Sequence, residues 1–188
     1  MSYIHEIQRK GIHQLSLAIP IGYWYLPETL FYQLIIPIAA IFISVDIARF
    51  KHPWFKRQFY RFFGSIIRQH EKNRFTGSSF LFFSVFITIY LFPKNIAVLS
   101  LLFLIICDTI AALVGIKFGR HKIFTKSLEG SLGFLISALL IAYLFKPVGF
   151  YAGSIGAVTA AVVELLPLKI DDNFTIPIIS SAVMIIFI

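Results

Sequence analysis

Long apolar runs separated by short polar segments form the dominant pattern of this chain. Seven such runs can be drawn, at residues 12–26, 30–48, 78–92, 95–116, 128–145, 148–166 and 174–188. Apolar stretches of this kind are typical of helices that cross a lipid bilayer. The pattern therefore predicts an all-α fold, a polytopic membrane helical bundle with about seven transmembrane helices. Several runs are shorter than the roughly 20 residues that a full crossing needs, and those at 12–26 and 78–92 fit least well.

Composition also indicates a membrane protein. The chain has 188 residues, of which 58% are hydrophobic and 21 are phenylalanine, and its mean hydropathy is +0.83. A soluble domain of this size does not carry such an apolar fraction. Cys107 is the only cysteine, so no intrachain disulfide can form. We expect one compact domain, residues 1–188, without a cleavable signal peptide.

The distribution of charge predicts an orientation. The formal net charge is +8, from 17 Lys and Arg against nine Asp and Glu. With the N-terminus in the cytosol, every cation except Lys94 and Lys146 falls in a cytosolic segment, as the positive-inside rule requires. The acids gather on the same side, with Glu28 as the exception. We therefore expect a multi-pass protein with a cytosolic N-terminus and an external C-terminus.

The same distribution bears on partners and location. The cations lie between apolar segments, where topology and anionic lipid headgroups account for them, so we expect no nucleic-acid partner. Because the acids and cations share one face, a polar site fed by a cytosolic solute is expected there. A short chain without a targeting segment suits a prokaryotic plasma membrane.

The segment 50–74 alternates cations with aromatic residues. In a helix, Phe55, Phe59, Phe62 and Phe63 would share one face, and the cations would lie largely elsewhere. This pattern predicts a cytosolic amphipathic helix that lies in the membrane interface. Such a helix can serve as a surface anchor or as a lid over a lipid-facing site, and the sequence leaves both interpretations open.

An acid inside an apolar run marks the first candidate site. Asp108 lies near the end of the run 95–116, and Ala112 and Gly115 follow it on the same helical face. Intramembrane acids are costly and usually functional, so Asp108 needs a cation, a metal or a hydrogen-bond partner. Gly115 and Gly119 also form a Gly-x-x-x-Gly pattern, which close helix packing explains without a ligand.

The segment Lys126-Ser127-Leu128-Glu129-Gly130-Ser131 opens the next apolar run. Ser127 or Ser131 can cap the helix that follows, and Glu129 favours its first turn. The free amides of a helix N-terminus beside two lysines, at 122 and 126, also suit an anion. The order Gly-x-x-x-x-Gly-Lys-Ser/Thr does not occur, so a phosphate bound here would not use a P-loop.

The last polar loop also contains carboxylates. Asp171-Asp172-Asn173 precedes the final apolar run, and Glu164 lies near the end of the run before it. These three consecutive residues can cap the last helix, but paired carboxylates and an amide oxygen are also hard ligands that suit Mg²⁺. Arg9 and Lys10 precede the first run, where cations usually set topology, and in the predicted orientation they meet the same face.

In combination these motifs resemble the polyprenol and diacylglycerol kinase family, whose members include dolichol kinase, yeast CTP-dependent diacylglycerol kinase and plant phytol kinase. The similarity rests on Asp108 with Ala111-Ala112, Gly115 and Phe118-Gly119, on Lys126-Ser127-x-Glu129-Gly130-Ser131, and on Asp171-Asp172-Asn173-x-x-x-Pro177. Arg9-Lys10-x-x-His13, Arg68-x-x-Glu71 and Thr76-Gly77 extend it over nearly the whole chain. Cys107 departs from the pattern, which has glycine before the acid. The resemblance implies an integral membrane kinase that phosphorylates a lipid alcohol such as diacylglycerol, a polyprenol or phytol, often with CTP.

A hypothesis of phosphoryl transfer assigns each motif a role on this resemblance. Mg²⁺ would be held by Asp108, Asp171, Asp172, Asn173 and Glu164. The nucleotide phosphates would meet Gly115, Gly119, Lys122, Lys126, Ser127, Glu129, Gly130 and Ser131. The candidate catalytic residues are Asp108, Lys126, Arg9 and Lys10, and the last two would add positive charge at the transferred group. The general base is unassigned, with Asp108 as a candidate.

Two other functions compete with a kinase. A membrane CTP:phosphatidate cytidylyltransferase would also use CTP and Mg²⁺ at an acidic cytosolic site, although its Lys-Asp and distal Asp-Arg signature is not found here. A small non-enzymatic transporter would use buried acids for proton coupling. A transporter would carry polar groups on both faces, whereas the external side here is almost bare. These patterns specify neither the lipid alcohol nor an oligomeric state.

Overall fold

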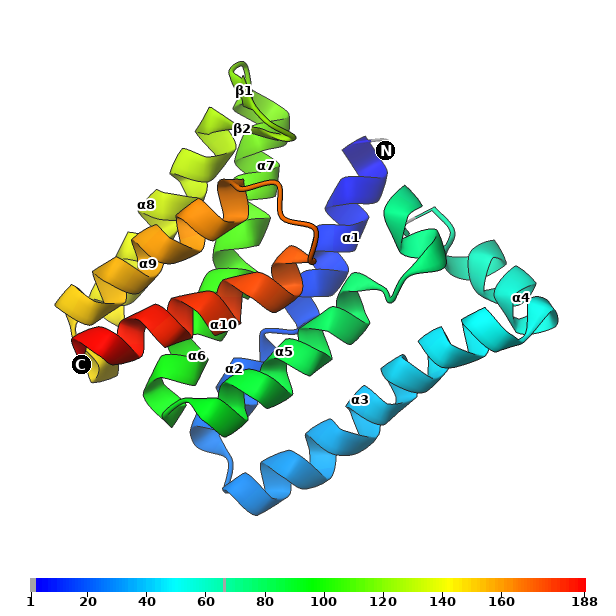
Figure 1. Ribbon diagram of the computed structural model, residues 1–188, viewed down its shortest axis with the longest axis horizontal. Helices are drawn as coiled ribbons and strands as arrows, with labels where there is room; N and C mark the ends of the chain where they lie inside the picture. The colour runs from blue at the N-terminus through cyan, green and yellow to red at the C-terminus, as the bar shows by residue number, and fades with distance from the viewer. Residues whose placement is uncertain (1–2, 66) are drawn as a thin grey trace.

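The structure, a computed structural model that describes residues 3–65 and 67–188, consists almost entirely of helices (Figure 1). The α-helices are α1 (Tyr3–Leu15), α2 (Ala18–Tyr25), α3 (Glu28–Lys51), α4 (Pro53–Phe63), α5 (Gly77–Leu91), α6 (Lys94–Leu102), α7 (Asp108–Phe118), α8 (Leu128–Leu144), α9 (Phe150–Leu165) and α10 (Asp172–Met184). Short turns of other helix types are η1 (Gln69–Asn73), η2 (Phe103–Cys107), η3 (Lys146–Val148) and η4 (Ile185–Phe187). The all-α prediction is confirmed except for a small antiparallel hairpin, β1 (Lys122–Ile123) with β2 (Lys126–Ser127). Each of its strands has two residues, too few to produce an alternating hydropathy pattern.

Helix length separates two helices from the others. α3 has 24 residues, the continuous helix formed by α6, η2 and α7 has 25, and both are long and apolar enough to cross a membrane. The shorter apolar helices in the described part of the chain, α5, α8, α9 and α10 with η4, have at most 17 residues. At 1.5 Å per residue, 17 residues extend about 25 Å, less than the roughly 30 Å of hydrocarbon. The prediction of seven transmembrane helices is therefore not confirmed, because only two helices in the described part of the chain are long enough to span a membrane.

The first predicted span, 12–26, is divided between two helices. α1 ends at Leu15 and α2 begins at Ala18, with a turn between them. α1 packs against α7, whereas α2 packs against α6. The other predicted spans correspond to α3, α5, α6 to α7, α8, α9 and α10, with boundaries that agree to within a few residues. The predicted amphipathic segment contains α4 and η1.

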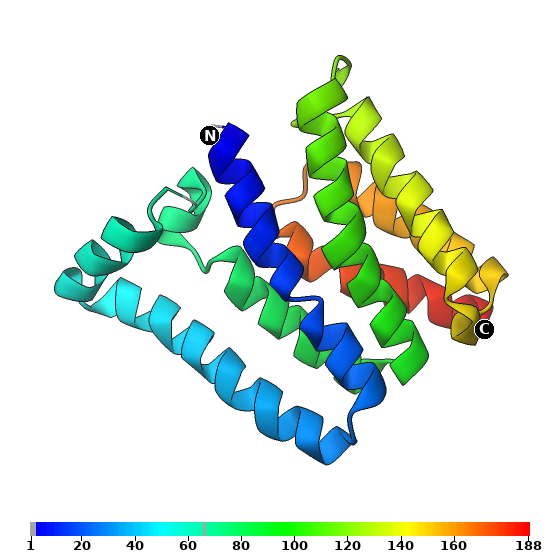
Figure 2. The same ribbon diagram turned by 180° about the vertical axis from the view of Figure 1, so that it is seen from behind.

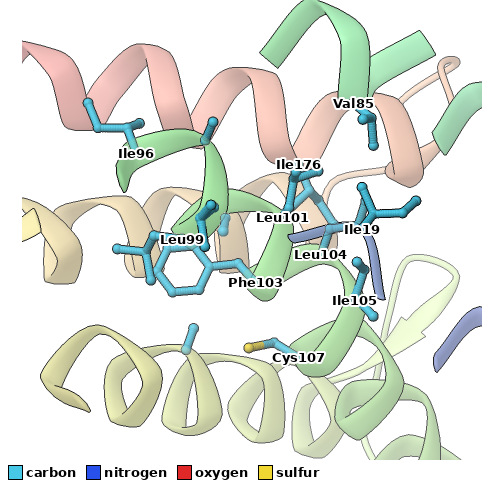
Figure 3. Packing of buried hydrophobic residues seen from close by; sticks show 14 of the residues in the cluster. Ile19, Val85, Ile96, Leu99, Leu101, Phe103, Leu104, Ile105, Cys107 and Ile176 are labelled. Carbon is cyan, nitrogen blue, oxygen red and sulfur yellow. The ribbon is translucent and has the colours of Figure 1, made fainter. Parts of the chain in front are cut away.

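The helix formed by α6, η2 and α7 is the centre of the core. Its side chains Leu99, Leu101, Phe103 and Leu104 are fully buried (Figure 3). Around it, α7 packs against α8, α8 against α9, and α9 against α10. The middle turn, η2, is π-helical and ends directly before Asp108. A π turn contains one more residue than an α turn, so it rotates the residues that follow it, Asp108 among them, about the helix axis. Such turns often occur at functional sites.

The outer surface of the helices is apolar. Exposed side chains include Leu34, Ile38 and Ile41 on α3, and Ile136 and Leu140 on α8. Of the apolar window of α3, 22% is buried, against 67% for the α6 to α7 helix. α3 leans away from the bundle towards α4, as Figures 1 and 2 show from opposite sides. An apolar exterior of this extent requires lipid around it, so the protein is a membrane protein.

Gly156 sets the separation between α9 and α10. A β-carbon at Gly156 would overlap the side chain of Met184, which is fully buried. We expect Gly156→Ala to displace α10 and to lower the free energy of unfolding by about 1–3 kcal/mol. Thermal unfolding of the purified protein in detergent measures the change. Gly11→Ala is the matched control, because nothing lies within 4 Å of a β-carbon there, and an equal loss in both variants would contradict this packing role.

Candidate functional site

A pocket of about 880 Å³ lies at the end of the bundle where α1, α7, the β1–β2 hairpin and the α9–α10 loop meet. Figure 1 shows these elements together in the upper part of the molecule, although they come from distant parts of the chain. The predicted site residues that line the pocket are Lys10, Asp108, Gly115, Gly119, Lys122, Lys126, Ser127, Gly130, Ser131, Glu164, Asp171 and Asp172. The structure therefore brings together most of the residues that the sequence singles out.

Asp108 is paired with Lys10. The Lys10 ammonium donates to the Asp108 carboxylate and, at 3.1 Å, to the Asp108 carbonyl oxygen. The Lys10 side chain is buried, so each charge depends on the other for compensation. Gln14, one turn along α1, donates to Ile105 O at 2.7 Å and to Thr109 Oγ1 at 2.6 Å. These contacts hold α1 against the central helix. Of the partners predicted for Asp108, the structure shows a cation, Lys10.

Lys126 connects the other two acidic segments of the pocket. Its ammonium lies 2.8 Å from Glu164 Oε1, near the end of α9, and 2.8 Å from Asp172 Oδ2, at the start of α10. Ser131 of α8 adds a hydrogen bond of 3.1 Å to Glu164 Oε2. One cation on a two-residue strand thus holds two carboxylates from different helices.

Burial and neighbouring charges act in opposite directions on the groups around Lys126. Burial favours the neutral form of Lys126, but Asp172 and Glu164 outweigh it, so the pKa of Lys126 is raised and the ammonium stays charged. Burial of Asp172, together with repulsion from Asp108 and Asp171, raises the pKa of Asp172 despite the attraction of Lys126. Burial is the largest of these effects on Asp172, so this carboxylate is poorly solvated, and a bound cation would favour its charged form.

The N-terminus of α8 forms another wall of the pocket. Ser127 caps this helix by accepting a hydrogen bond from the Gly130 amide at 3.1 Å, which confirms one of the two predicted caps. A β-carbon at Gly130 would lie 2.8 Å from Ala111 O, so glycine allows α8 to approach α7 closely. β-Carbons at Gly115 and Gly119 would each lie 2.9 Å from Ser127 Oγ. The glycines thus keep this wall open and bring the helix N-terminus, a site that suits anions, beside Asp108.

Three predicted site residues do not line the pocket. Arg9 pairs with Glu6 within α1. Glu129 accepts hydrogen bonds from the backbone amide and the ring of His121. Asn173 donates to Gly77 O at 3.2 Å. Successive helical residues point about 100° apart, so a neighbour of a lining residue in sequence can face another element.

The structure adds residues that the sequence did not assign to the site. Glu6, Arg68, Arg74, Phe75 and Phe80 line the pocket. Arg68 belongs to a motif of the resemblance, but its place in the pocket lining depends on tertiary packing and leaves no local signal. α4 itself does not line the pocket, so the wall comes from the residues after it and the lid interpretation gains no support from this arrangement.

The pocket contains carboxylate donors without a preformed metal cage. Among residues 3–65 and 67–188, no group of three or more His, Cys, Asp or Glu side chains is arranged to hold an ion. Asp108, Asp172 and Glu164 face the pocket but are paired with lysines. Mg²⁺ usually keeps several waters and takes one or two carboxylates together with substrate phosphates. This donor set therefore fits a metal that arrives with a nucleotide.

Comparison with known proteins identifies the relatives of this chain. It is 37% identical over 186 residues to an uncharacterized protein of Rickettsia prowazekii, an alignment that covers 92% of this chain and 90% of the relative. It is 34% identical over 206 residues to CTP-dependent diacylglycerol kinase 1 of Schizosaccharomyces pombe, covering 96% and 92%. The chain belongs to the CTP-dependent lipid kinase family.

This membership confirms the resemblance that the motifs carry. The kinase of the same name from Saccharomyces cerevisiae is 28% identical over 211 residues, covering 96% of this chain and 72% of the relative. No protein-family model and no solved structure matches the chain. In this family member, the pocket described above contains most of the site residues that the motifs predict.

Removal of Lys126 tests the electrostatics of the site. Lys126→Met leaves Glu164 and Asp172 without their shared cation, so we expect a loss of about 3 kcal/mol in the free energy of unfolding. The double variant Lys126→Met/Glu164→Gln removes one of the unpaired charges and should recover part of that loss. Thermal unfolding in detergent measures both variants. A double variant no more stable than Lys126→Met would contradict this explanation.

Proposed function

We propose that this protein transfers the terminal phosphate of CTP to the hydroxyl of a lipid alcohol, with diacylglycerol as the leading acceptor and Mg²⁺ as the metal. The observation that carries the proposal is the convergence of Lys10, Lys126, Asp108 and Asp172 in one pocket that also contains the N-terminus of α8. The names of the yeast relatives support CTP and diacylglycerol. A polyprenol is a second acceptor of the same chemical class.

The nucleotide phosphates lie, in this proposal, against the hairpin and the start of α8. Lys122 and Lys126 offer ammonium groups, and the amides between Ser127 and Ser131 offer a helix N-terminus. Lys126 exchanges its carboxylate partners for phosphate oxygens when the nucleotide binds. Because Lys126 remains charged in the empty pocket, it needs no proton before it binds the phosphates.

The carboxylates lie opposite these lysines. Asp108 and Asp172 would hold Mg²⁺, with Asp171 and Glu164 as further donors, and the bound ion would neutralise charge on the phosphates during transfer. Lys10 fixes the position of Asp108 through its two hydrogen bonds. If Asp108 held the ion, the Lys10 ammonium would be available to the transferred group.

The membrane orientation belongs to the same proposal. With a cytosolic N-terminus, the pocket faces the compartment that supplies the nucleotide. The cations Lys122, Lys169 and Arg74 at the pocket then lie at the level of anionic lipid headgroups. The lipid hydroxyl reaches the pocket sideways from the membrane surface. The bacterial relative is consistent with a prokaryotic plasma membrane.

Asp108→Asn tests the catalytic assignment. The variant keeps the shape of the side chain but loses the charge that metal and Lys10 require, so we expect phosphorylation to fall at least about 100-fold. The measurement is transfer of label from γ-labelled CTP to diacylglycerol by the purified protein with Mg²⁺. Glu28→Gln is the control, because Glu28 is an exposed carboxylate at the start of α3 and does not line the pocket.

The same assay separates the proposal from its rivals. A kinase moves γ-label to the lipid and releases CDP, whereas a cytidylyltransferase moves α-label to the lipid and releases pyrophosphate. Normal turnover by a folded Asp108→Asn protein would overturn the role of Asp108. If the wild-type protein labels no lipid alcohol in a panel that includes polyprenols and phytol, with CTP or ATP, it is not a lipid kinase.

A further inference from the structure

α3 carries a buried ion pair near its C-terminal end. Asp46 and Arg49 are each 1% exposed, and Arg49 Nη2 lies 2.9 Å from Asp46 Oδ1. The rest of this helix is largely exposed and apolar. A buried ion pair contributes little net stability because desolvation opposes it, but it can specify one arrangement of the groups around it. The partners of the pair show which arrangement that is.

Asp46 holds the start of α5. Its Oδ2 accepts hydrogen bonds from the Thr76 amide at 2.7 Å, from Thr76 Oγ1 at 2.8 Å and from Ser79 Oγ at 2.7 Å. Thr76 is the N-cap residue of α5. A carboxylate from α3 therefore satisfies an amide at the start of another helix and fixes where that helix begins.

Arg49 holds the segment that precedes α5. Its guanidinium donates to Glu71 O at 2.9 Å and to Arg74 O at 2.6 Å. It also donates to the Tyr60 hydroxyl of α4 at 3.1 Å. The planar fork of arginine serves these separate acceptors at once, which a lysine ammonium cannot reproduce. Arg49 thus connects α3 both to α4 and to the segment 68–77.

Glu71 links the two ends of the same segment. Its Oε2 accepts from the Arg68 amide at 3.0 Å and its Oε1 from the Gly77 amide at 3.2 Å. At Gly77 the segment also meets α10, because a β-carbon there would lie 2.6 Å from Asn173 Nδ2. α3 therefore holds this segment at residues 71, 74 and 76, and α10 contacts it at Gly77.

This segment forms one wall of the pocket. Arg68, Arg74 and Phe75 line it, and Phe80 of α5 follows them. The wall combines cations with aromatic side chains, whereas the hairpin wall presents Lys122 and Lys126 beside a helix N-terminus. A surface with both characters fits an amphiphile, whose apolar part meets the rings and whose polar head meets the arginines. It also adjoins α3, the long helix with the most exposed apolar surface.

We propose that the buried Asp46–Arg49 pair positions the segment 68–77 as the wall that receives the lipid alcohol. This inference rests on the proposed kinase function. The pair touches neither substrate, so Asp46 and Arg49 are positioning residues that act through the segment. Arg68 and Arg74 are the cations that this wall offers to the polar head of the acceptor.

Arg49→Lys tests the inference, because it keeps the charge opposite Asp46 and removes the arginine fork. We expect the KM for diacylglycerol, measured as its mole fraction in mixed micelles, to rise about 10-fold, since hydrogen bonds from a charged donor are lost. The KM for CTP should be unchanged, and amide hydrogen exchange should accelerate in residues 68–77. Lys51→Met is the matched control, because Lys51 is an exposed cation on the same helix.

The outcomes separate the positioning role from the kinase function. Unchanged KM for the lipid, an equal rise in both KM values, or unchanged exchange in residues 68–77 would overturn the inference. A wild-type protein that labels no lipid would fail the proposed function instead, and the acceptor role would fall with it. Ser79→Ala removes a single hydrogen bond to Asp46. If Arg49→Lys does not fold, this milder variant must show the same selective rise in the lipid KM, or the inference is wrong.

Discussion

Compensation of buried carboxylates by lysines is the constraint around which the pocket is organised. Asp108, Glu164 and Asp172 come from three helices and face one pocket, an arrangement that is unfavourable without nearby cations. Lys126 lies 2.8 Å from both Glu164 and Asp172, and Lys10 pairs with Asp108. These pairs also connect α1 to α7 and the hairpin to α9 and α10. The ion pairs that compensate these carboxylates therefore also hold the walls of the pocket in place.

The pocket is suited to a ligand that carries both a cation and phosphates. In the proposed function, the phosphate groups would bind the lysines and the carboxylates would bind the metal. Each charged group would then change its partner without becoming unpaired. The raised pKa of Asp172 shows that burial of this carboxylate outweighs its attraction to Lys126 before a ligand binds. Such exchange of partners keeps the empty site stable and leaves it ready for charge-assisted contacts.

The sequence predicts the helices well because their signals are local. Hydropathy locates α3, α5, α8, α9 and α10 to within a few residues, and Ser127 and Asp171 cap α8 and α10 as their positions suggest. Hydropathy does not predict the break between α1 and α2. That break depends on which neighbour each helix packs against, and an average over apolar residues contains no such information.

Local patterns in the chain are sufficient to identify an α-helical membrane protein of a lipid kinase family, and they single out Asp108, Lys126 and Asp172 as chemically unusual. Which residues share the pocket depends instead on the packing of distant segments. Lys10 and Asp108 are 98 residues apart, and Lys126 and Asp172 are 46 apart. The same packing leaves Glu129 and Asn173 outside the pocket lining and places Arg68 in it. This follows because the direction of a side chain depends on helix rotation and packing, which contacts between distant segments set.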